Sequence, residues 1–557
     1  MKYLYRTKFI QIIFFFTSTI ICGQNIKSPL KIPINLSGTF GELRNTHFHS
    51  GIDIKTKGKI GLKVYSVDDG NIIRIRIDKG GYGKSLYIKH PNGIISVYAH
   101  LKKFSKKIES HIKSLQYKNK TYEIDEFPET EELNVKSGDL VGYSGNTGSS
   151  SGPHLHFELR DSKTNEPLNP LKLGLDVIDT IKPKINSLYL YKVYNDGSYD
   201  FIEKIKIKKI KNGNYIASPI KQTGMLGIGI NYFDKQNKSY SKNGIYSIDF
   251  MMENLSIFNY QMDKISFDDK KFLNLMVDYK NWFHKKKRIQ KLFVHPKSKY
   301  SFLKTSDLSG IFNVSKDKKY TGNIELKDYL GNKTSLTLSF EGVTNDSVYS
   351  KIEKKLIHTE FEYTFKLNKV SVYFPKQTFY NSVRFNIKKK DDTLDLGKDI
   401  HPVRNSFEIN FNVLNKDSLF IKKGFIAKLN KKNNPIYLKT KKENSNWSIK
   451  TNKLARYTLS IDTIAPYVKA INFKKDKWIS DLKKLKLTIK DDISGVKSIE
   501  GTINGTWILL EHEPKNNTIT YDFSDINFKS GKHLLSIKVL DLNGNKYEYK
   551  TVFYKKY

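Results

Sequence analysis

Two histidines, His154 and His156, stand two residues apart in the segment "HLHFE". Alternate side chains of an extended strand share one face, so both imidazoles point the same way while Leu155 and Phe157 point into a core. Taken alone, a pair with this spacing is more often two surface or hydrogen-bonded side chains. Two imidazoles on one face are also what a metal site needs.

A histidine and a carboxylate stand about a hundred residues earlier, at His49 and Asp53 in "HSGID". Their spacing is also even, which places them together if the segment is extended, and Gly51 between them disfavours a helix. Three nitrogen and oxygen ligands with a fourth position open for water describe a catalytic zinc site. The two segments together therefore predict metal-assisted hydrolysis.

The elements that must position these residues are short strands. Between Gly38 and about Leu173, alternating runs such as "GNIIRIRID" and "PNGIISVYAHL" are broken by Gly, Asn and Pro, which is typical of antiparallel strands and hairpins. We expect a compact all-β domain with no convincing helix of length. A polar insertion, residues 102–134, is expected to make a surface excursion over one edge of the sheet.

At these residues the sequence resembles the lysostaphin/LytM-type zinc metallopeptidases, a family of peptidoglycan endopeptidases. The resemblance covers about residues 38–173 and rests on three motifs in the family's order: "HSGID", "YAHL" and "GNTGSSSGPHLHFE". It implies a LytM-type antiparallel β domain with one Zn²⁺ per chain, bound by His49, Asp53 and His156. It also implies that His154 is the general base and that His100, in "YAHL", holds or polarises the reacting group.

Three further residues near these motifs receive other interpretations. His47 would share a face with His49, but no carboxylate stands four residues beyond it, which disfavours it as a ligand. His90 precedes a hairpin turn in "IKHPNG" and is interpreted as structural. Glu158 continues the face of His154 and His156 and is interpreted as a residue that supports the ligands.

Residues 1–23 predict an export signal, with a basic start followed by an apolar run too short to span a bilayer. The single cysteine, Cys22, lies in this segment, so a mature chain has no thiol ligand. Lipidation at Cys22 is the alternative, although Ile21 before it is large for such a signal. We expect an exported protein, in the periplasm or on the outer cell surface, with no transmembrane segment after the signal is removed.

The formal net charge of +40 favours an anionic polymer as partner, or else reflects lysines spread over a solvated surface. We expect no nucleic-acid partner, because Lys is interspersed with Asp and Glu and an exported protein rarely meets nucleic acid. Peptidoglycan is the partner that the resemblance implies.

Beyond the first domain the chain repeats short elements. "DTIKP" at 179–183 recurs as "DTIAP" at 462–466, "DLSGI" at 307–311 as "DISGV" at 492–496, and "DYLGN" at 328–332 as "DLNGN" at 541–545. The D-x-x-G-N elements are interpreted as hairpin turns in β-sandwich modules. The expected division is a signal at 1–23, the peptidase domain at 24–178, β-sandwich regions at 179–345 and 346–460, and an immunoglobulin-like sandwich at 461–557.

The resulting functional hypothesis is an exported zinc metalloendopeptidase that hydrolyses peptide cross-links of peptidoglycan. One alternative is a non-catalytic wall-binding or amidase-activating scaffold that keeps the fold. Another is a surface protease that acts on proteins. The insertion after "YAHL" bears on substrate choice, since every ligand that the resemblance implies is present.

Overall fold

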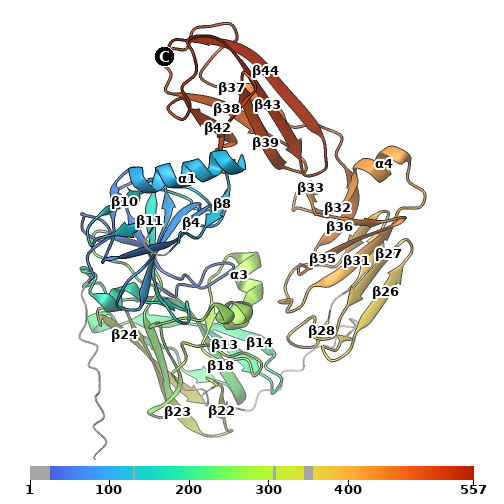
Figure 1. The fold of residues 1–557 in the computed structure, drawn as a ribbon. Coiled ribbons are helices and arrows are strands. Elements are labelled where there is room, and N and C mark those ends of the chain that lie inside the picture. The colour runs from blue at the N-terminus through green and yellow to red at the C-terminus, as the bar shows by residue number, and fades with distance from the viewer. Residues whose placement is uncertain (1–25, 130–131, 305–308, 344–355, 385) are drawn as a thin grey trace, which may run out of the picture.

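The computed structural model describes residues 26–557 except 130–131, 305–308, 344–355 and 385. The predicted export signal and Cys22 lie outside the described residues. The described chain is almost entirely antiparallel β structure, arranged as an N-terminal β domain followed by three β modules (Figure 1). The all-β prediction is confirmed. Among the described residues, no helix is long and apolar enough to cross a membrane.

The N-terminal domain is built on a 9-stranded sheet in which β2, β11 and β6 are neighbours near the centre. Its strands are β1 (Leu36–Gly38), β2 (Ile52–Lys55), β4 (Gly70–Ile77), β5 (Lys84–Lys89), β6 (Ile94–Leu101), β8 (Ile124–Glu126), β9 (Asn134–Val135), β11 (His154–Asp161) and β12 (Pro167–Leu168). A 3-stranded sheet consists of β3 (Lys63–Tyr65), β10 (Leu140–Tyr143) and β7 (Lys103–Phe104).

The insertion contains a helix that the sequence analysis did not expect. Helix α1 (Lys106–Asn119) follows β7, and the chain then returns to the sheet edge as β8, which pairs with β4. Ile108 and Ile112 are buried one turn apart on the domain core, and Lys120 ends the helix in the left-handed conformation. The expectation of no helix of length was wrong, because two buried isoleucines are enough to dock a helix that is otherwise polar.

The first module contains two sheets. One has β13 (Lys184–Val193), β14 (Tyr199–Ile205), β18 (Gly224–Phe233), β21 (Gln290–Lys291) and β22 (Phe312–Val314). The other has β15 (Ile207–Lys209), β16 (Tyr215–Ala217), β17 (Ile220–Lys221), β19 (Ser247–Met252), β20 (Leu255–Gln261), β23 (Lys319–Lys327) and β24 (Lys333–Glu341). Two short helices, α2 (Leu273–Met276) and α3 (Tyr279–Lys285), lie between β20 and β21.

The second module pairs two 5-stranded sheets around one core. These contain β26 (Tyr363–Leu367), β27 (Val370–Phe374), β31 (Phe407–Asn412), β34 (Lys441–Glu443) and β35 (Asn446–Thr451), and β29 (Lys388–Lys390), β30 (Thr393–Asp395), β32 (Gly424–Leu429), β33 (Pro435–Tyr437) and β36 (Arg456–Ile461). The strands β25 (Leu356–Ile357) and β28 (Val383–Arg384) pair with each other, and helix α4 (Ser418–Lys423) precedes β32.

The third module also has two facing sheets that share one core. These contain β37 (Tyr467–Ala470), β38 (Lys484–Lys490), β41 (Glu511–Glu513) and β42 (Thr518–Asp522), and β39 (Val496–Ile503), β40 (Thr506–Ile508), β43 (Gly531–Asp541) and β44 (Lys546–Lys555). The D-x-x-G-N elements form the β23–β24 and β43–β44 hairpin turns, as predicted. The predicted domain boundaries and the immunoglobulin-like character stay predictions.

The N-terminal domain and the first module share one hydrophobic cluster. Phe48, one residue before His49, packs its ring 5.1 Å from that of Phe302 in the first module, and both are buried. Polar contacts cross the same junction, since the Leu36 amide donates to Gln236 Oε1 at 2.7 Å. The sheet that carries the candidate site therefore rests on the first module.

The third module lies against helix α1 of the N-terminal domain (Figure 1). Lys113 of α1 pairs with Asp525 at 2.5 Å, and Tyr117 packs its ring 5.3 Å from that of Trp507. The side chain of Lys84 on β5, itself buried, pairs with Glu511 at 2.8 Å. The last module to be synthesised thus contacts the first domain.

The shared core predicts that Phe302→Ala lowers the free energy of unfolding by about 3–5 kcal/mol, because it leaves a cavity beside Phe48. Urea unfolding of the full chain, followed by tyrosine and tryptophan fluorescence, measures the loss. Tyr240→Ala is the matched control, since Tyr240 in the same module is 93% exposed. Equal stability of the two variants would contradict the shared core.

Candidate active site

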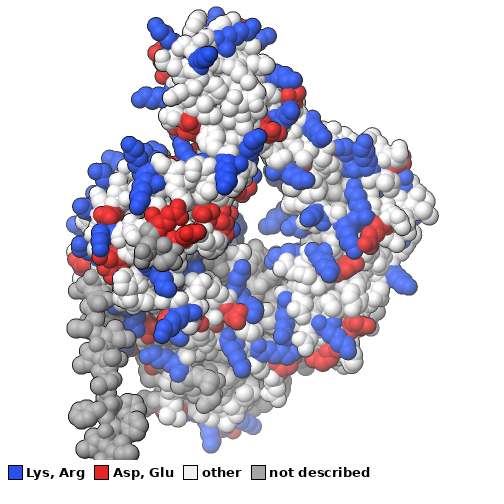
Figure 2. Space-filling view, viewed as in Figure 1, with Lys and Arg blue, Asp and Glu red and all other residues white. Residues whose placement is uncertain are grey.

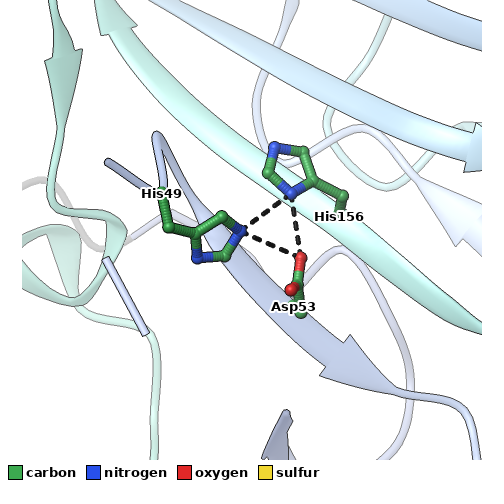
Figure 3. A group of neighbouring side chains, drawn as sticks. All are labelled: His49, Asp53 and His156. Carbon is green, nitrogen blue, oxygen red and sulfur yellow. Dashed lines mark hydrogen bonds and ion pairs between the residues drawn. The ribbon is translucent and has the colours of Figure 1, made fainter. Parts of the chain in front are cut away.

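Three ligand atoms converge where the loop before β2 meets β2 and β11 (Figure 3). His49 Nε2 lies 3.1 Å from Asp53 Oδ1 and 3.1 Å from His156 Nδ1, and His156 Nδ1 lies 2.9 Å from Asp53 Oδ1. All three side chains are buried. The structure therefore brings together the three predicted ligands, in a group that could hold a metal ion.

The three ligands are positioned in two different ways. His156 and Asp53 lie opposite each other in the β2–β11 ladder, and Leu155 and Phe157 are fully buried on the other face, as strand alternation predicts. His49 instead lies before β2, where the chain bends at Gly51. A Cβ at Gly51 would stand 2.3 Å from the Phe157 carbonyl oxygen, so only glycine allows this approach. The extended conformation that we assumed for the segment from His49 to Asp53 was therefore wrong.

Partners outside the group fix the orientation of each ligand. His49 Nδ1 lies 2.8 Å from the Thr39 carbonyl oxygen, and His156 Nε2 lies 2.8 Å from Glu158 Oε1. Both acceptors require an N–H on the nitrogen that faces them, so His49 Nε2 and His156 Nδ1 are the nitrogens that face the group. Arg44 donates to Asp53 Oδ2 at 2.9 Å and leaves Oδ1 facing inward. Such outer partners are what metal-binding histidines and carboxylates require.

Glu158 is fully buried and supports His156. Burial disfavours its ionised form, but the charge of Arg160 and the hydrogen bond to His156 outweigh burial and hold the pKa of Glu158 well below its usual range. Arg160 Nη2 lies 2.7 Å from Glu158 Oε2, and the hydroxyls of Ser50 and Tyr82 donate to Oε1. Glu158 is therefore a permanent carboxylate, in agreement with its interpretation as a supporting residue.

His154 lies beside the group, with Nε2 3.4 Å from Asp53 Oδ1. Its Nδ1 lies 2.8 Å from the Gly152 carbonyl oxygen, so Nδ1 carries the hydrogen and Nε2 offers a lone pair to the site. About 15% of the side chain is exposed, more than for either ligand histidine. His154 thus combines access from solvent with a nitrogen that can accept a proton.

His100 reaches the site through a β-bulge. The β5–β6 register shifts between Lys84 and Leu86, and His100 itself has a φ of 58°. Bulges next to active sites redirect side chains, and this one places the His100 ring 4.9 Å from that of His154. Burial, followed by the nearby His156 and His154, lowers the pKa of His100 to about 3. The ring is neutral, and because its Nδ1 lies 2.9 Å from the Thr147 carbonyl oxygen, Nε2 is left as an acceptor.

The residues of the group fit zinc. Two nitrogens and one oxygen that face each other at these distances form a donor set that Zn²⁺ can bridge once His156 Nδ1 has lost its proton. A tetrahedral site with bonds of about 2.0–2.1 Å has ligand–ligand distances of roughly 3.3 Å, close to the separations observed. Burial disfavours the ionised form of Asp53, but the nearby His49 outweighs it and holds the pKa of Asp53 well below its usual range, so Asp53 is an anionic ligand.

Of the other sequence candidates, His47 is exposed and outside the group. His90 is buried between the Asp69 carbonyl oxygen and Ser96 Oγ, each at 2.7 Å, in agreement with a structural role. The sequence analysis gave no role to Arg44 or Tyr82, which support Asp53 and Glu158. Only the folded structure shows that these two side chains reach the site.

One model of a protein family matches this part of the chain: peptidase family M23, over residues 47–117 and 115–170. The N-terminal domain is an M23 peptidase domain. A second model, the Zu5-like domain, matches residues 354–462, which make up most of the second module.

Curated proteins resemble a part of this chain. The DD-carboxypeptidase/endopeptidase Mpg of Neisseria meningitidis serogroup B is 34% identical over 158 residues, which is 28% of this chain and 30% of that protein. The peptidoglycan DD-endopeptidase ShyB of Vibrio cholerae is 30% identical over 146 residues, which is 26% of this chain and 28% of that protein. The matched part is thus about a third or less of the length of these relatives.

Among solved structures, a zinc-containing peptidase from Vibrio cholerae matches with 25% identity and a TM-score of 0.19, over 28% of this chain and 41% of that chain. The catalytic domain of lysostaphin from Staphylococcus simulans matches with 24% identity and a TM-score of 0.18, over 24% of this chain and 86% of that chain.

The protonation of His156 predicts that zinc binding releases a proton. Burial disfavours the charged imidazole, but the hydrogen bonds that the ring donates to Asp53 and Glu158 outweigh it and raise the pKa of His156 to about 9. The imidazole therefore carries a proton at pH 7.5, which zinc must displace from Nδ1. We expect about one proton released per zinc, and an affinity that rises roughly tenfold per pH unit up to about pH 9.

Calorimetric zinc titrations in buffers of different ionisation enthalpy measure this proton release. Uptake of one zinc between pH 7 and 8 without release of a proton would contradict the predicted charge of His156.

Proposed function

We propose that the chain is an exported zinc endopeptidase that hydrolyses peptide cross-links of peptidoglycan. The observation that carries the proposal is the convergence of His49, Asp53 and His156, with His154 and His100 turned toward the same point. The M23 domain and the names of its relatives, which include peptidoglycan DD-endopeptidases, support the substrate class.

His49 Nε2, Asp53 Oδ1 and His156 Nδ1 would hold the zinc. When bound, zinc lowers the pKa of water and polarises a substrate carbonyl. His154 Nε2 accepts the proton of the attacking water and delivers it to the leaving amine nitrogen. The hydrogen bond from Nδ1 to the Gly152 carbonyl oxygen keeps the ring turned toward the site through both transfers.

His100 is the second histidine of the proposed mechanism. Its neutral Nε2 accepts a hydrogen bond from the water or from the amide N–H of the substrate, which aligns the reacting group. His100 and His154 depend on one loop, because Thr147 and Gly152 supply the two carbonyl oxygens. Lys515 of the third module donates to the Asn146 and Ser150 carbonyl oxygens of that loop.

The charge distribution fits attachment to an anionic cell wall. Lys and Arg are spread over all parts of the visible face instead of forming one patch (Figure 2). A dispersed positive surface makes many weak contacts that salt screens, and so holds an enzyme near a polymer without fixing its register. The predicted export signal at residues 1–23 would bring the chain to the wall.

The scaffold alternative does not account for the site. A non-catalytic domain needs neither converging lone pairs nor a histidine turned into the site beside them, and both are present here. Action on protein substrates is separated from action on the wall by the experiment that follows.

Digestion of purified sacculi by the full chain, with and without a chelator, tests the proposed function. We expect soluble muropeptides whose peptide cross-links are cut, identified by mass spectrometry, and their loss when a chelator is present. Intact sacculi alongside cleavage of an unfolded protein substrate would instead establish a protein-directed protease. No cleavage of either by the zinc-loaded chain would establish the scaffold.

Because His156 is a proposed ligand and His154 is the proposed general base, their alanine variants should have two different defects. His156→Ala removes a ligand and should abolish binding of one equivalent of zinc, whereas His154→Ala should keep the zinc and lower kcat on a cross-linked muropeptide by about 10²–10⁴-fold. Metal analysis and single-substrate kinetics measure the two effects. His47→Ala, an exposed histidine beside the site, should change neither. Full zinc in His156→Ala, or near-normal turnover in His154→Ala, would overturn the assignment.

A further inference from the structure

The repeated sequence elements bring aspartates together at two places outside the peptidase site. Asp179 of "DTIKP" meets Asp328 of "DYLGN", and Asp462 of "DTIAP" meets Asp541 of "DLNGN". Each pair is joined by a third aspartate that no repeat marked. We name Asp179, Asp234 and Asp328 the first aspartate cluster, and Asp462, Asp491 and Asp541 the second. In each cluster one oxygen per residue lies within 4.8 Å of the others.

The two clusters occupy the same positions in their modules. The first member precedes the first strand, β13 or β37, and the second directly follows the strand that pairs with it, β18 or β38. The third begins the turn of the long hairpin, β23–β24 or β43–β44. The turn asparagine repeats as well, since Asn332 Nδ2 donates to the Asp179 carbonyl oxygen and Asn545 Nδ2 to that of Asp462, both at 3.0 Å.

Oxygens in both clusters are buried without a partner. Asp234 and Asn243 are each 4% exposed, and within the described part of the chain neither Asp234 Oδ1 nor Asn243 Oδ1 has a hydrogen-bond partner. Both residues line one cavity of about 40 Å³ with Asp179 and Asp328. In the second cluster Asp462 is fully buried, and its Oδ2 likewise has no partner among the described residues. Such oxygens need a cation or a proton donor.

No positive side chain neutralises the clusters. None of the six carboxylates forms an ion pair with a Lys or Arg of the described residues, although the chain is rich in lysine. Burial and the neighbouring Asp179 and Asp328 raise the pKa of Asp234 to about 8, and burial raises that of Asp179 to about 6. Three carboxylates so close cannot all stay ionised at neutral pH without a compensating charge.

We propose that each aspartate cluster binds one calcium ion. Oxygen-only ligands select a hard cation, whereas zinc prefers the histidine nitrogens of the peptidase site. Carboxylates from three separate segments, with an amide oxygen beside them in the first cluster, suit the irregular coordination of calcium better than the strict octahedron of magnesium.

The positions of the clusters indicate what calcium would do. The cavity of the first cluster is also lined by Leu36 and Leu171 of the M23 domain, and Asp179 lies in the segment that leaves that domain. Asp462 directly follows β36, the last strand of the second module. Each ion therefore ties the segment that enters a module to two turns of that module, and stiffens the junction with the preceding domain.

Calorimetric titration of the full chain with calcium chloride, in the presence of one equivalent of zinc chloride, tests the proposal. We expect two further equivalents of calcium with dissociation constants of about 10⁻³ M or tighter, weaker magnesium binding, and a rise of several degrees in the thermal unfolding midpoint. Asp234→Asn and Asp491→Asn should each remove one equivalent. Asp196→Asn, a turn aspartate that accepts from the Ser198 amide, should remove none.

The stability of Asp234→Asn separates a metal site from a merely structural aspartate. Without calcium this variant should be at least as stable as the unaltered chain, because it relieves repulsion among the carboxylates; with calcium it should be the less stable of the two. Equal destabilisation under both conditions would overturn the calcium role. So would the absence of calcium binding, magnesium binding of equal strength, or two equivalents retained by both Asn variants. None of these outcomes depends on peptidase activity.

Discussion

The peptidase site depends on holding the lone pairs of two imidazoles and one carboxylate within about 3 Å of each other. Three side chains keep this arrangement only if the rest of the domain fixes the orientation of each one. It does so with neutral or oppositely charged partners behind each ligand: the Thr39 carbonyl oxygen, Glu158 with Arg160, and Arg44. The pairing of β2 with β11 places Asp53 opposite His156 and so fixes the relative position of two of the three ligands.

The first module also helps to position a ligand of the M23 domain. His49 lies in a loop, outside the β ladder, and its position depends on what packs behind that loop. Phe48 provides this packing by contacting Phe302, so the first module supports the segment that carries His49. One hydrophobic cluster spans both regions, so the position of His49 depends on packing in the first module.

Strand alternation and the resemblance together predicted the ligands, the neighbouring histidines and the all-β fold. Alternation worked for His154 and His156 because their strand is regular and buried on one face. It failed for His49, where a glycine bend replaces the strand, and for α1, whose two buried isoleucines are too sparse a signal among charged residues. The sequence analysis did not identify Asp234 and Asp491 for another reason. Both lie outside the repeats, and only the pairing of strands brings them to the repeated aspartates.

The contact of Lys515 with the loop at residues 146–152 has a consequence for the order of events as the protein is made. A chain emerges from the ribosome N-terminus first, so the M23 domain can fold long before residue 515 exists. The loop that holds His100 and His154 acquires its last contact only when the third module docks on α1. Maturation of the active site is thereby coupled to completion of the polypeptide, and in a truncated translation product the loop that orients His100 and His154 would lack its contacts with Lys515.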